Sequence, residues 1–431
     1  MSTYMELAKK KEIHDDFLKI SRSEGIDIQD IMREVASGHL VIIPNYSKGA
    51  PIALGKIVRS KVLCNFGTSS FCQDIDVEIE KVKIAIQRHA SFVCDQSVGD
   101  HVYEHRKKLI AAIEVPIASI PLYQNVEESR SKKGDPLAFT TDEVLEVFER
   151  QIESGVTAPG IHTMNKELAK NYLDGAQRLM PIVSRGGGII NAWIKRYNAE
   201  NPYLQHFDKI LKIAKRYNVP LTFVTACRSG TVVDGFDECQ KTEWKMLRSY
   251  IKMAHEEGVS IIVDGLGHMA MDQIPDAIKT LKEICYGVPL GVLGPAVTDR
   301  GLGHEHIVNA IGTAVAVWHG ANYCNACYCT EHLGLPELQD IASGIAASLV
   351  ATNIGDLARN EMKSTLLKEE MKISQARKNN RWGIMLECAL DKEEAKITFN
   401  RVGQKNKDGQ GCSICGDLCP FVITGQVQNK A

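Results

Sequence analysis

The sequence predicts an α/β protein built on a closed (β/α)₈ barrel. Short apolar segments with strand character alternate with amphipathic helical segments about eight times between residues 57 and 330. This alternation is typical of a parallel sheet whose strands are covered by helices, and eight repeats favour closure into a TIM barrel. An open doubly wound sheet is the alternative, but no Gly-x-Gly-x-x-Gly turn follows the first predicted strand.

The predicted strands are short and apolar, and each ends in a turn or a polar residue. They cover residues 61–65, 91–95, 115–123, 158–162, 179–183, 220–224, 259–264 and 288–293. Apolar positions with interleaved charges predict helices over residues 77–89, 103–112, 141–154, 204–217, 243–257, 272–285 and 307–318. The polar stretch 127–136 is predicted to be a surface loop.

Three further regions complete the predicted organisation. Residues 1–56 form an N-terminal element with helical pieces, residues 331–402 a C-terminal helical region, and residues 403–431 a flexible tail that carries cysteines. The run 403–411 is rich in glycine and lysine and predicts a tether. Such a tether allows the tail to reach the mouth of its own barrel or of a partner's.

Composition narrows the class of protein. Of 431 residues, 44% are apolar and 24% are charged, and the net charge of −2 argues against a general nucleic-acid or membrane-surface role. No apolar run reaches the length of a membrane span, and the first residues lack a signal segment, so we expect a cytoplasmic protein. The 13 cysteines are an odd number in a chain with a large core, which fits a reducing, anaerobic cell.

Three cysteines lie within eight positions near the end of the chain: Cys412, Cys415 and Cys419. Structural zinc sites use four ligands, and cubane iron–sulfur clusters usually take four thiolates. Three thiolates would hold three irons of a [4Fe–4S] cluster and leave the fourth iron open to a small chelating molecule. The alternatives are a zinc knuckle completed by a distant histidine, and incidental cysteines in a disordered tail.

Polar residues follow the predicted strands at the end where a barrel places its active site. They are Asn65, Asp95, Tyr123, His162, Ser184, Arg185, Arg228, Asp264 and His268. The run from Ser184 to Gly188, Ser-Arg-Gly-Gly-Gly, exposes backbone N–H groups beside a guanidinium, and Arg228 adds a second positive charge. This combination suits a phosphate, and a flexible turn is the alternative.

Two histidines near neighbouring strand ends, His268 and His306, could share a metal ion and leave positions for water or substrate. His304 is a rival for the second position, and hydrogen-bonded structural histidines are the alternative. The nearby Cys324 and Cys327 would face opposite sides of a strand, so we expect them to pack in the core.

In this order, these segments resemble the radical S-adenosylmethionine family of phosphomethylpyrimidine synthase, the thiamin pyrimidine enzyme. The resemblance runs from about residue 39 to about residue 360 and resumes at the tail. It is carried by Ile42-Ile43-Pro44-Asn45, Lys61-Val62 with Asn65 and Gly67, Ile120 to Gln124, Ile161-His162, Ile182 to Gly187, Gly265 with Gly267-His268, Leu293-Gly294-Pro295 with Thr298-Asp299, His306-Ile307 and Glu331 to Pro336.

The resemblance implies a barrel enzyme whose tail cysteines hold a [4Fe–4S] cluster that binds S-adenosylmethionine, with zinc on His268 and His306. Its substrate would be 5-aminoimidazole ribotide, a phosphorylated imidazole nucleotide. It also implies a homodimer and an electron donor such as ferredoxin or flavodoxin. The implied substrate-binding residues are Asn65, Cys94, Tyr123, His162, Ser184, Arg185, Gly186, Thr225, Ala226, Cys227, Arg228 and Asp264.

The chain departs from that family where the reacting ring would lie. Cys94 replaces a methionine, Thr225-Ala226-Cys227 replaces Asp-Gly-Leu, Asp264 replaces a glutamate, and Gly291 replaces a tyrosine that contacts substrate. The tail has three residues instead of four between its second and third cysteines. The same substrate with a different product is the simplest account, which resembles the 5-hydroxybenzimidazole synthase branch of cobalamin biosynthesis.

Cys94 and Cys227 are candidate donors of a hydrogen atom or a proton late in such a reaction. The thiamin pyrimidine synthase itself is the second interpretation. Two other classes stay open: a zinc hydrolase that uses His268 and His306 but not the tail, and a non-enzymatic iron–sulfur sensor that uses the tail but not the barrel mouth.

Overall fold

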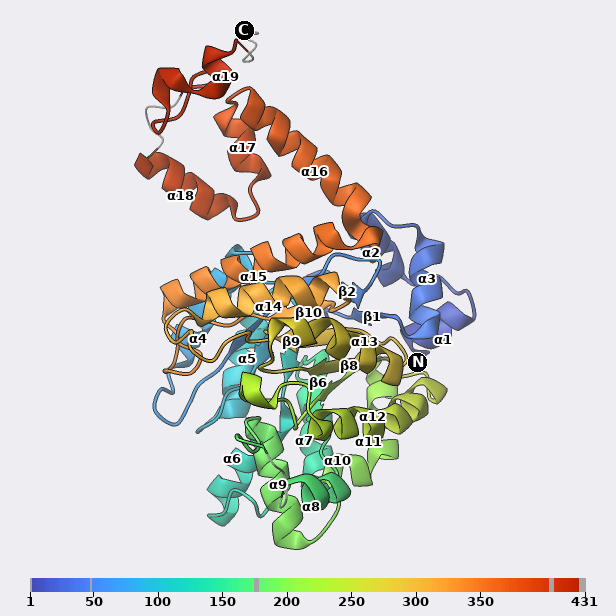
Figure 1. Ribbon diagram of the computed structural model, residues 1–431. Coiled ribbons are helices and arrows are strands. Elements are labelled where there is room, and N and C mark those ends of the chain that lie inside the picture. The colour runs from blue at the N-terminus through green and yellow to red at the C-terminus, as the bar shows by residue number, and fades with distance from the viewer. Residues whose placement is uncertain (1, 47–48, 174–177, 403–406, 426–431) are drawn as a thin grey trace. The chain divides into compact units, whose positions relative to one another are not determined.

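The computed structural model describes residues 2–46, 49–173, 178–402 and 407–425. The chain forms two compact units, Met1–Gly355 and Asp356–Ala431. Figure 1 shows the course of the chain through each of them.

Eight parallel strands close a barrel in the first unit, which confirms the predicted fold class. They are β3 (Lys61–Phe66), β4 (Phe92–Asp95), β5 (Ile117–Ser119), β6 (Ala158–His162), β7 (Leu221–Val224), β8 (Ile261–Gly265), β9 (Leu290–Leu293) and β10 (Tyr323–Asn325). Each strand pairs with the next along the chain, and β10 closes the barrel by pairing with β3. All carboxyl ends therefore meet at one mouth.

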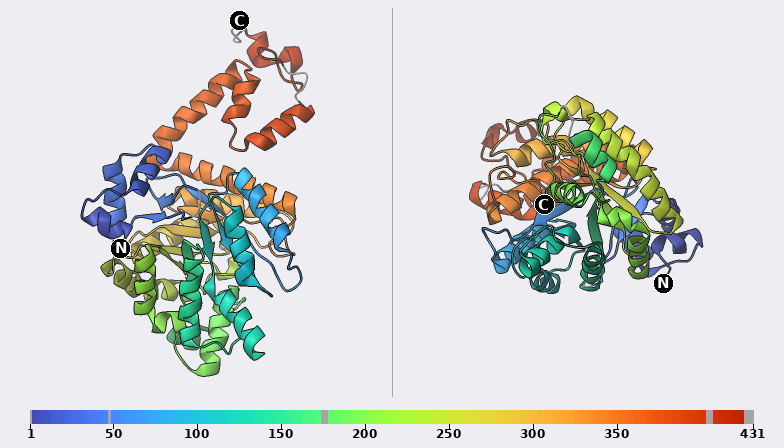
Figure 2. Two further views of the ribbon diagram at one scale, coloured as in Figure 1. Left: turned by 180° about the vertical axis from the view of Figure 1, so that it is seen from behind. Right: turned by 90° about the horizontal axis from the view of Figure 1, so that it is seen from below.

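Helices surround this barrel, as the view from below shows (Figure 2). They are α4 (Ile75–Gln87), α5 (Val102–Ala112), α6 (Pro121–Lys133), α7 (Thr141–Glu153), α8 (Lys166–Leu173), α9 (Arg185–Tyr197), α10 (Pro202–Gln205), α11 (Phe207–Tyr217), α12 (Glu238–Glu256), α13 (Ile274–Ile284), α14 (Glu305–Trp318) and α15 (Leu338–Ala358). Strand residues such as Val93, Ile161 and Phe223 are fully buried in the resulting core, which is why the strands read as apolar runs.

One predicted strand, residues 179–183, is wrong, because this segment has no strand structure. The backbone N–H groups of Leu179 and Met180 donate to the carboxylate of Asp234, at 3.0 and 2.9 Å, instead of to a neighbouring strand. Leu179 is 71% exposed. The eighth strand is instead β10, at residues that the strand prediction did not include.

The predicted loop 127–136 and the end of the predicted strand 115–123 are also wrong. The strand β5 ends at Ser119, and α6 begins at Pro121. Proline suits the first turn of a helix because the N–H group it lacks has no partner there.

The N-terminal residues form a small helical element with its own core. It contains α1 (Tyr4–Lys9), α2 (Asp15–Glu24), α3 (Ile28–Ser37) and the hairpin of β1 (Leu40–Ile43) and β2 (Ile52–Gly55). The hydroxyl of Thr3 donates to the carbonyl of Gly258 at 2.5 Å, and the Tyr4 N–H donates to Asn218 at 2.9 Å. Both partners precede barrel strands, so this element covers the amino ends of the strands and leaves the mouth free.

Among the described residues, α15 alone has the length and hydropathy of a membrane span. Half of that apolar window is buried, and Ile341 and Ile345 belong to the barrel core. The helix therefore packs as a core helix does.

The second unit is helical and ends in the cysteine segment. It contains α16 (Asn360–Lys378), α17 (Trp382–Cys388), α18 (Lys392–Val402), η3 (Gly416–Leu418) and α19 (Pro420–Ile423). Residues 403–406 of the predicted tether lie outside the described residues. Its later part is held: the Trp382 N–H donates to Asp408 at 2.9 Å, and the Gly409 N–H donates to the carbonyl of Asn380 at 3.2 Å.

Candidate active site

A chain of hydrogen-bonded amides crosses the barrel mouth. Gln96 donates to Asn65 at 2.9 Å, Asn65 donates to Asn325 at 3.1 Å, and Asn325 donates to both carboxylate oxygens of Asp264 at 3.1 Å. The predicted residues Asn65 and Asp264 thus lie in one network, joined by Asn325, which the sequence did not single out. Burial raises the pKa of Asp264 even though Asn325 donates to it.

Cys94 lies beside this network in the barrel interior. Together with Asn65, Asp264 and Asn325 it lines a cavity of about 50 Å³. Burial and the carboxylates of Asp95 and Asp264 raise the pKa of the Cys94 thiol. The thiol is therefore protonated at neutral pH and keeps a hydrogen that it can donate.

A cationic part of the mouth adjoins this network, because Arg185 donates to the backbone carbonyl of Gln96 at 3.2 Å. The Arg185 guanidinium lies 4.9 Å from the centre of the Tyr123 ring, and that ring lies 6.4 Å from the His162 ring. Burial, together with the charges of Arg228 and Arg185, lowers the pKa of His162 to about 3. The imidazole is therefore neutral, and its buried Nδ1 has no protein partner among the described residues.

The Ser-Arg-Gly-Gly-Gly run is the start of a helix and not a free turn. Ser184 caps α9, and its hydroxyl accepts from the Gly187 N–H at 3.3 Å. A Cβ at Gly186 would lie within 3 Å of the His162 ring, so only glycine lets the helix start approach this histidine. A helix N-terminus beside Arg185 favours an anion.

Residues Thr225 to Cys227 are held by a buried carboxylate. Glu243 accepts the N–H groups of Ala226 and Cys227, both at 2.8 Å, and the hydroxyl of Thr163 at 2.8 Å. The Thr225 hydroxyl is buried with no partner among the described residues. Arg228 follows directly, and its charge acts on His162 and Asp264. Glu243 thereby fixes the backbone that presents Arg228.

Cys227 does not reach the cavity that Cys94 lines. Its thiol interacts with Cys239, the second residue of α12, and Arg178 donates to its backbone oxygen at 2.6 Å. Facing a helix outside the barrel, it is not placed to act on a substrate in the barrel. This position of the thiol does not favour the predicted catalytic role of Cys227.

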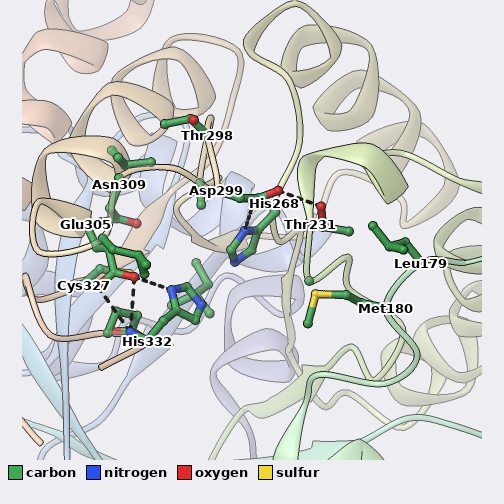
Figure 3. A pocket seen from close by; sticks show the side chains of 17 residues that line it. Leu179, Met180, Thr231, His268, Thr298, Asp299, Glu305, Asn309, Cys327 and His332 are labelled. Atoms are coloured by element: carbon green, nitrogen blue, oxygen red, sulfur yellow. Dashed lines mark hydrogen bonds and ion pairs between the residues drawn. The ribbon is translucent and has the colours of Figure 1, made fainter. Parts of the chain in front are cut away.

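His268 and His332 face a pocket of about 250 Å³ at the barrel mouth (Figure 3). Their ring centres lie 5.1 Å apart. The Nδ1 of His268 lies 2.6 Å from a carboxylate oxygen of Asp299, and the Nδ1 of His332 hydrogen-bonds to Glu305. A carboxylate on Nδ1 fixes the tautomer and leaves Nε2 with a lone pair for a metal.

The carboxylates that orient these histidines are themselves held. Asp299 accepts the Thr231 hydroxyl at 2.6 Å and the Val232 N–H at 3.0 Å. Burial alone would raise the pKa of Asp299, but these donors and His268 lower it. Glu305 also accepts the backbone N–H of His332 at 3.2 Å. Both carboxylates are therefore held in position to accept a hydrogen bond from the Nδ1 of their imidazole.

His306, the predicted second metal ligand, lies elsewhere. It is the second residue of α14, and its Nδ1 is buried without a partner among the described residues. Its charged neighbours are His304 and Asp340, and the residues that line the His268 pocket do not include it. The structure brings His332 beside His268 instead. Among the described residues no three His, Cys, Asp or Glu side chains converge as a metal site.

The three tail cysteines are unpaired thiols in one short loop of the second unit. The Gly416 N–H donates to the Cys412 carbonyl at 2.7 Å, and a Cβ at Gly411 would lie within 3 Å of Gly416 and Cys419. The N–H groups of Cys415 and Ile414 lower the pKa of Cys412. The loop therefore turns tightly and favours a thiolate, which fits a cluster held by three cysteines.

A parallel barrel with this mouth, and a separate loop with three thiols, define an enzyme of the radical S-adenosylmethionine class. The chain matches the model of the Radical SAM ThiC family over residues 3–426 and belongs to that family. Membership implies a [4Fe–4S] cluster and S-adenosylmethionine as cofactors.

The names of curated relatives are consistent with membership of this family. The chain is 34% identical to a phosphomethylpyrimidine synthase of Methanocaldococcus jannaschii, covering 99% of this chain and 100% of the relative. It is 36% identical to one of Pyrococcus abyssi, covering 99% of each. A solved dihydropteroate synthase of Yersinia pestis is similar at a TM-score of 0.40 and 10% identity, over 70% of this chain and 94% of that one. Likeness at that level does not bear on function.

Proposed function

We propose that this enzyme converts 5-aminoimidazole ribotide to 5-hydroxybenzimidazole. The observation that carries the proposal is the division of the mouth into two parts. The cationic part keeps the residues that resemble the family's phosphate site, whereas the cavity that would receive the ring is lined by Cys94 and Asp264. The resemblance gives a methionine and a glutamate at those two positions.

The phosphate would bind at the start of α9. Arg185 and Arg228 supply positive charge there, Gly186 lets the helix start approach, and Ser184 fixes the cap. The neutral His162 has a free Nδ1 that would take a hydrogen bond from the ribose. A dianionic phosphate between two guanidiniums accepts strong charge-assisted hydrogen bonds.

The imidazole ring would enter the cavity that Asn65, Cys94 and Asp264 line. The amide chain from Gln96 to Asp264 would orient the ring through polar atoms at its edge. Tyr123 would cover the ribose, since its ring lies close to both Arg185 and His162. The buried thiol of Cys94 would donate a hydrogen atom to a product radical late in the reaction. The thiyl radical that remains would be restored to the thiol by one electron from the external electron donor and one proton from water.

His268 and His332 would hold a zinc ion at the edge of the same mouth, with water or a cofactor atom in the remaining positions. This pair replaces the pair of His268 and His306. Asp299 and Glu305 would keep both imidazoles in the tautomer that binds a metal.

Cys412, Cys415 and Cys419 would hold the cluster. With S-adenosylmethionine bound, the cluster supplies one-electron chemistry that yields a 5′-deoxyadenosyl radical able to abstract hydrogen from the ribose. From the resemblance we also propose a homodimer and a ferredoxin or flavodoxin as electron donor.

The second candidate function is phosphomethylpyrimidine synthase, which would act on the same ribotide. The names of the curated relatives favour it. It requires that Cys94, Asp264 and Gly291 have no effect on the product.

A substrate-dependence experiment tests the shared part of both candidates. The cluster is reconstituted without oxygen, and 5′-deoxyadenosine is measured with reductant and either the ribotide or its dephosphorylated riboside. We expect formation with the ribotide, much less with the riboside, and none in a Cys415→Ala variant. Equal formation with both compounds would remove the phosphate site from the account.

A further inference from the structure

Three positions in one row cross the barrel interior on neighbouring strands. Asp264 on β8 is in register with Gly291 on β9, and Gly291 is in register with Tyr323 on β10. Residues in one row of a parallel sheet point to the same face. Asp264 and Tyr323 both line the barrel cavity, so the row faces inward and Gly291 leaves a gap in it.

The Tyr323 ring fills that gap. A Cβ at Gly291 would lie within 3 Å of both Cζ and the hydroxyl oxygen of Tyr323. Gly291 is not among the glycines with positive φ, so its backbone does not require glycine. Glycine at position 291 therefore makes room for the Tyr323 ring, which a larger residue would displace. The Phe92 ring packs edge-on against Tyr323, with centres 5.3 Å apart, and holds it in place.

The hydroxyl of Tyr323 reaches across β9 toward Asp264, and its electrostatic interaction with that carboxylate shifts the pKa of both groups. Asn325 lies on the same face of β10 and donates to the same carboxylate. Burial and the charge of Asp264 raise the pKa of Tyr323 far above its usual value. The hydroxyl therefore stays protonated and donates, and its oxygen keeps lone pairs that face the cavity.

We propose that Tyr323 and Asp264 form a pair that positions the aminoimidazole ring, and that Gly291 is the residue that permits this pair. The two oxygens offer acceptors, at one end of the cavity, to a planar heterocycle that carries N–H donors. Tyr323 is then a specificity-determining residue supplied by β10. The inference rests on the proposed substrate and deepens it.

The test measures both the affinity for the ribotide and the coupling between 5′-deoxyadenosine formation and product formation. Dissociation constants for 5-aminoimidazole ribotide are determined by calorimetry on cluster-loaded enzyme without reductant, and 5′-deoxyadenosine formed per product is measured under turnover. Tyr323→Phe removes only the hydroxyl, and Gly291→Ala keeps the hydroxyl but displaces the ring. For each variant we expect about tenfold weaker binding or more and more deoxyadenosine per product. Tyr203→Phe, at a buried tyrosine of α10 outside the cavity, should match the wild type.

Asp264→Asn completes a double-mutant cycle with Tyr323→Phe. If the residues act as a pair, the double variant loses less affinity than the sum of the single losses. Affinity and coupling that stay at the wild-type level in both Tyr323→Phe and Gly291→Ala would overturn the inference, provided that circular dichroism shows both folded. If either variant does not fold, the other decides. A wild-type enzyme that neither binds nor turns over the ribotide would instead contradict the proposed function.

Discussion

Cys94 lies in strand β4 and Cys227 follows strand β7, and their thiols face different surroundings. Cys94 lines the ring cavity, whereas Cys227 faces Cys239 outside it. We expect Cys94→Ser to lower the product formed per 5′-deoxyadenosine by about tenfold or more, since a serine O–H does not replace a thiol as hydrogen donor. Cys227→Ser should keep the wild-type ratio. Liquid chromatography with mass detection measures both compounds, and equal ratios in the two variants would remove the role of Cys94.

Arg185 is the exposed cation of the proposed phosphate site. Because charge-assisted hydrogen bonds contribute about 1.5–3 kcal/mol, Arg185→Ala should weaken ribotide binding by about 10- to 100-fold. The dephosphorylated riboside should lose little affinity with the same change. Arg33→Ala on the exposed face of α3 is the matched control. Similar losses for ribotide and riboside would mean that Arg185 does not contact the phosphate.

Strand-end positions let the sequence single out Asn65, His162 and Asp264 as candidate site residues, because a barrel brings such positions together. Arg185 was singled out after a predicted strand that does not form, and it lies instead at the start of α9. The sequence could not identify His332 as the neighbour of His268. His332 follows the short strand β10, and the contact depends on how two loops fold over the mouth. The tyrosine that faces Asp264 was hidden for a related reason, since only the register of β9 and β10 shows what a missing side chain at Gly291 permits.

At the scale of elements, the loops after β8 and β10 carry the two histidines of the proposed metal site. His268→Ala and His332→Ala should each abolish stoichiometric zinc binding, and Glu305→Gln should weaken it by about 10- to 100-fold through loss of the hydrogen bond to Nδ1. His306→Ala should bind zinc as the wild type does. Metal content by mass spectrometry, with a competing chelator, checks all four. Zinc loss in His306→Ala with retention in His332→Ala would restore the other histidine pair.

His255, near the end of α12, packs against Gly38 of the N-terminal element. Burial, with Lys9 and His39 nearby, lowers the pKa of His255 to about 4 from its ordinary value of 6.5. The unfolded chain therefore takes up a proton at this residue before the folded protein does. Its contribution to stability is present above pH 6.5 and is lost as pH falls toward 4, by at most about 1.4 kcal/mol per pH unit.

Urea unfolding between pH 7 and pH 4 tests this effect. We expect the free energy of unfolding to fall less steeply with pH in His255→Gln than in the wild type. His319→Gln, at the C-terminal end of α14, is the control, and we expect it to keep the wild-type slope. The same slope in wild type and His255→Gln would contradict the prediction.

Most barrel strands could be predicted because a strand buried on both faces is a continuous apolar run between helical segments. The run 179–183 has the same pattern, but Leu179 and Met180 line a pocket and their N–H groups donate to Asp234. Strand β10 has only three residues, too few to show a period. The start of α9 was hidden because glycine is a poor helix former, although Ser184 is a suitable cap.

At the scale of the whole molecule, one unit holds the barrel with the proposed substrate site, and the second unit carries the three tail cysteines. Family membership fixes the class of chemistry, and the curated relatives are named for the thiamin product. The proposed phosphate-site residues are among the segments that carry the sequence resemblance. The barrel cavity proposed for the ring is lined by Cys94, Asp264 and Tyr323. The central claim is that the same substrate gives a different product.

The product of the wild-type enzyme tests this claim most directly. Reconstituted enzyme is supplied with 5-aminoimidazole ribotide, S-adenosylmethionine and reductant without oxygen, and the aromatic product is identified by mass and by whether it carries phosphate. The account predicts 5-hydroxybenzimidazole, which carries none. Phosphorylated hydroxymethylpyrimidine would contradict it and would show that the altered cavity residues do not determine the product.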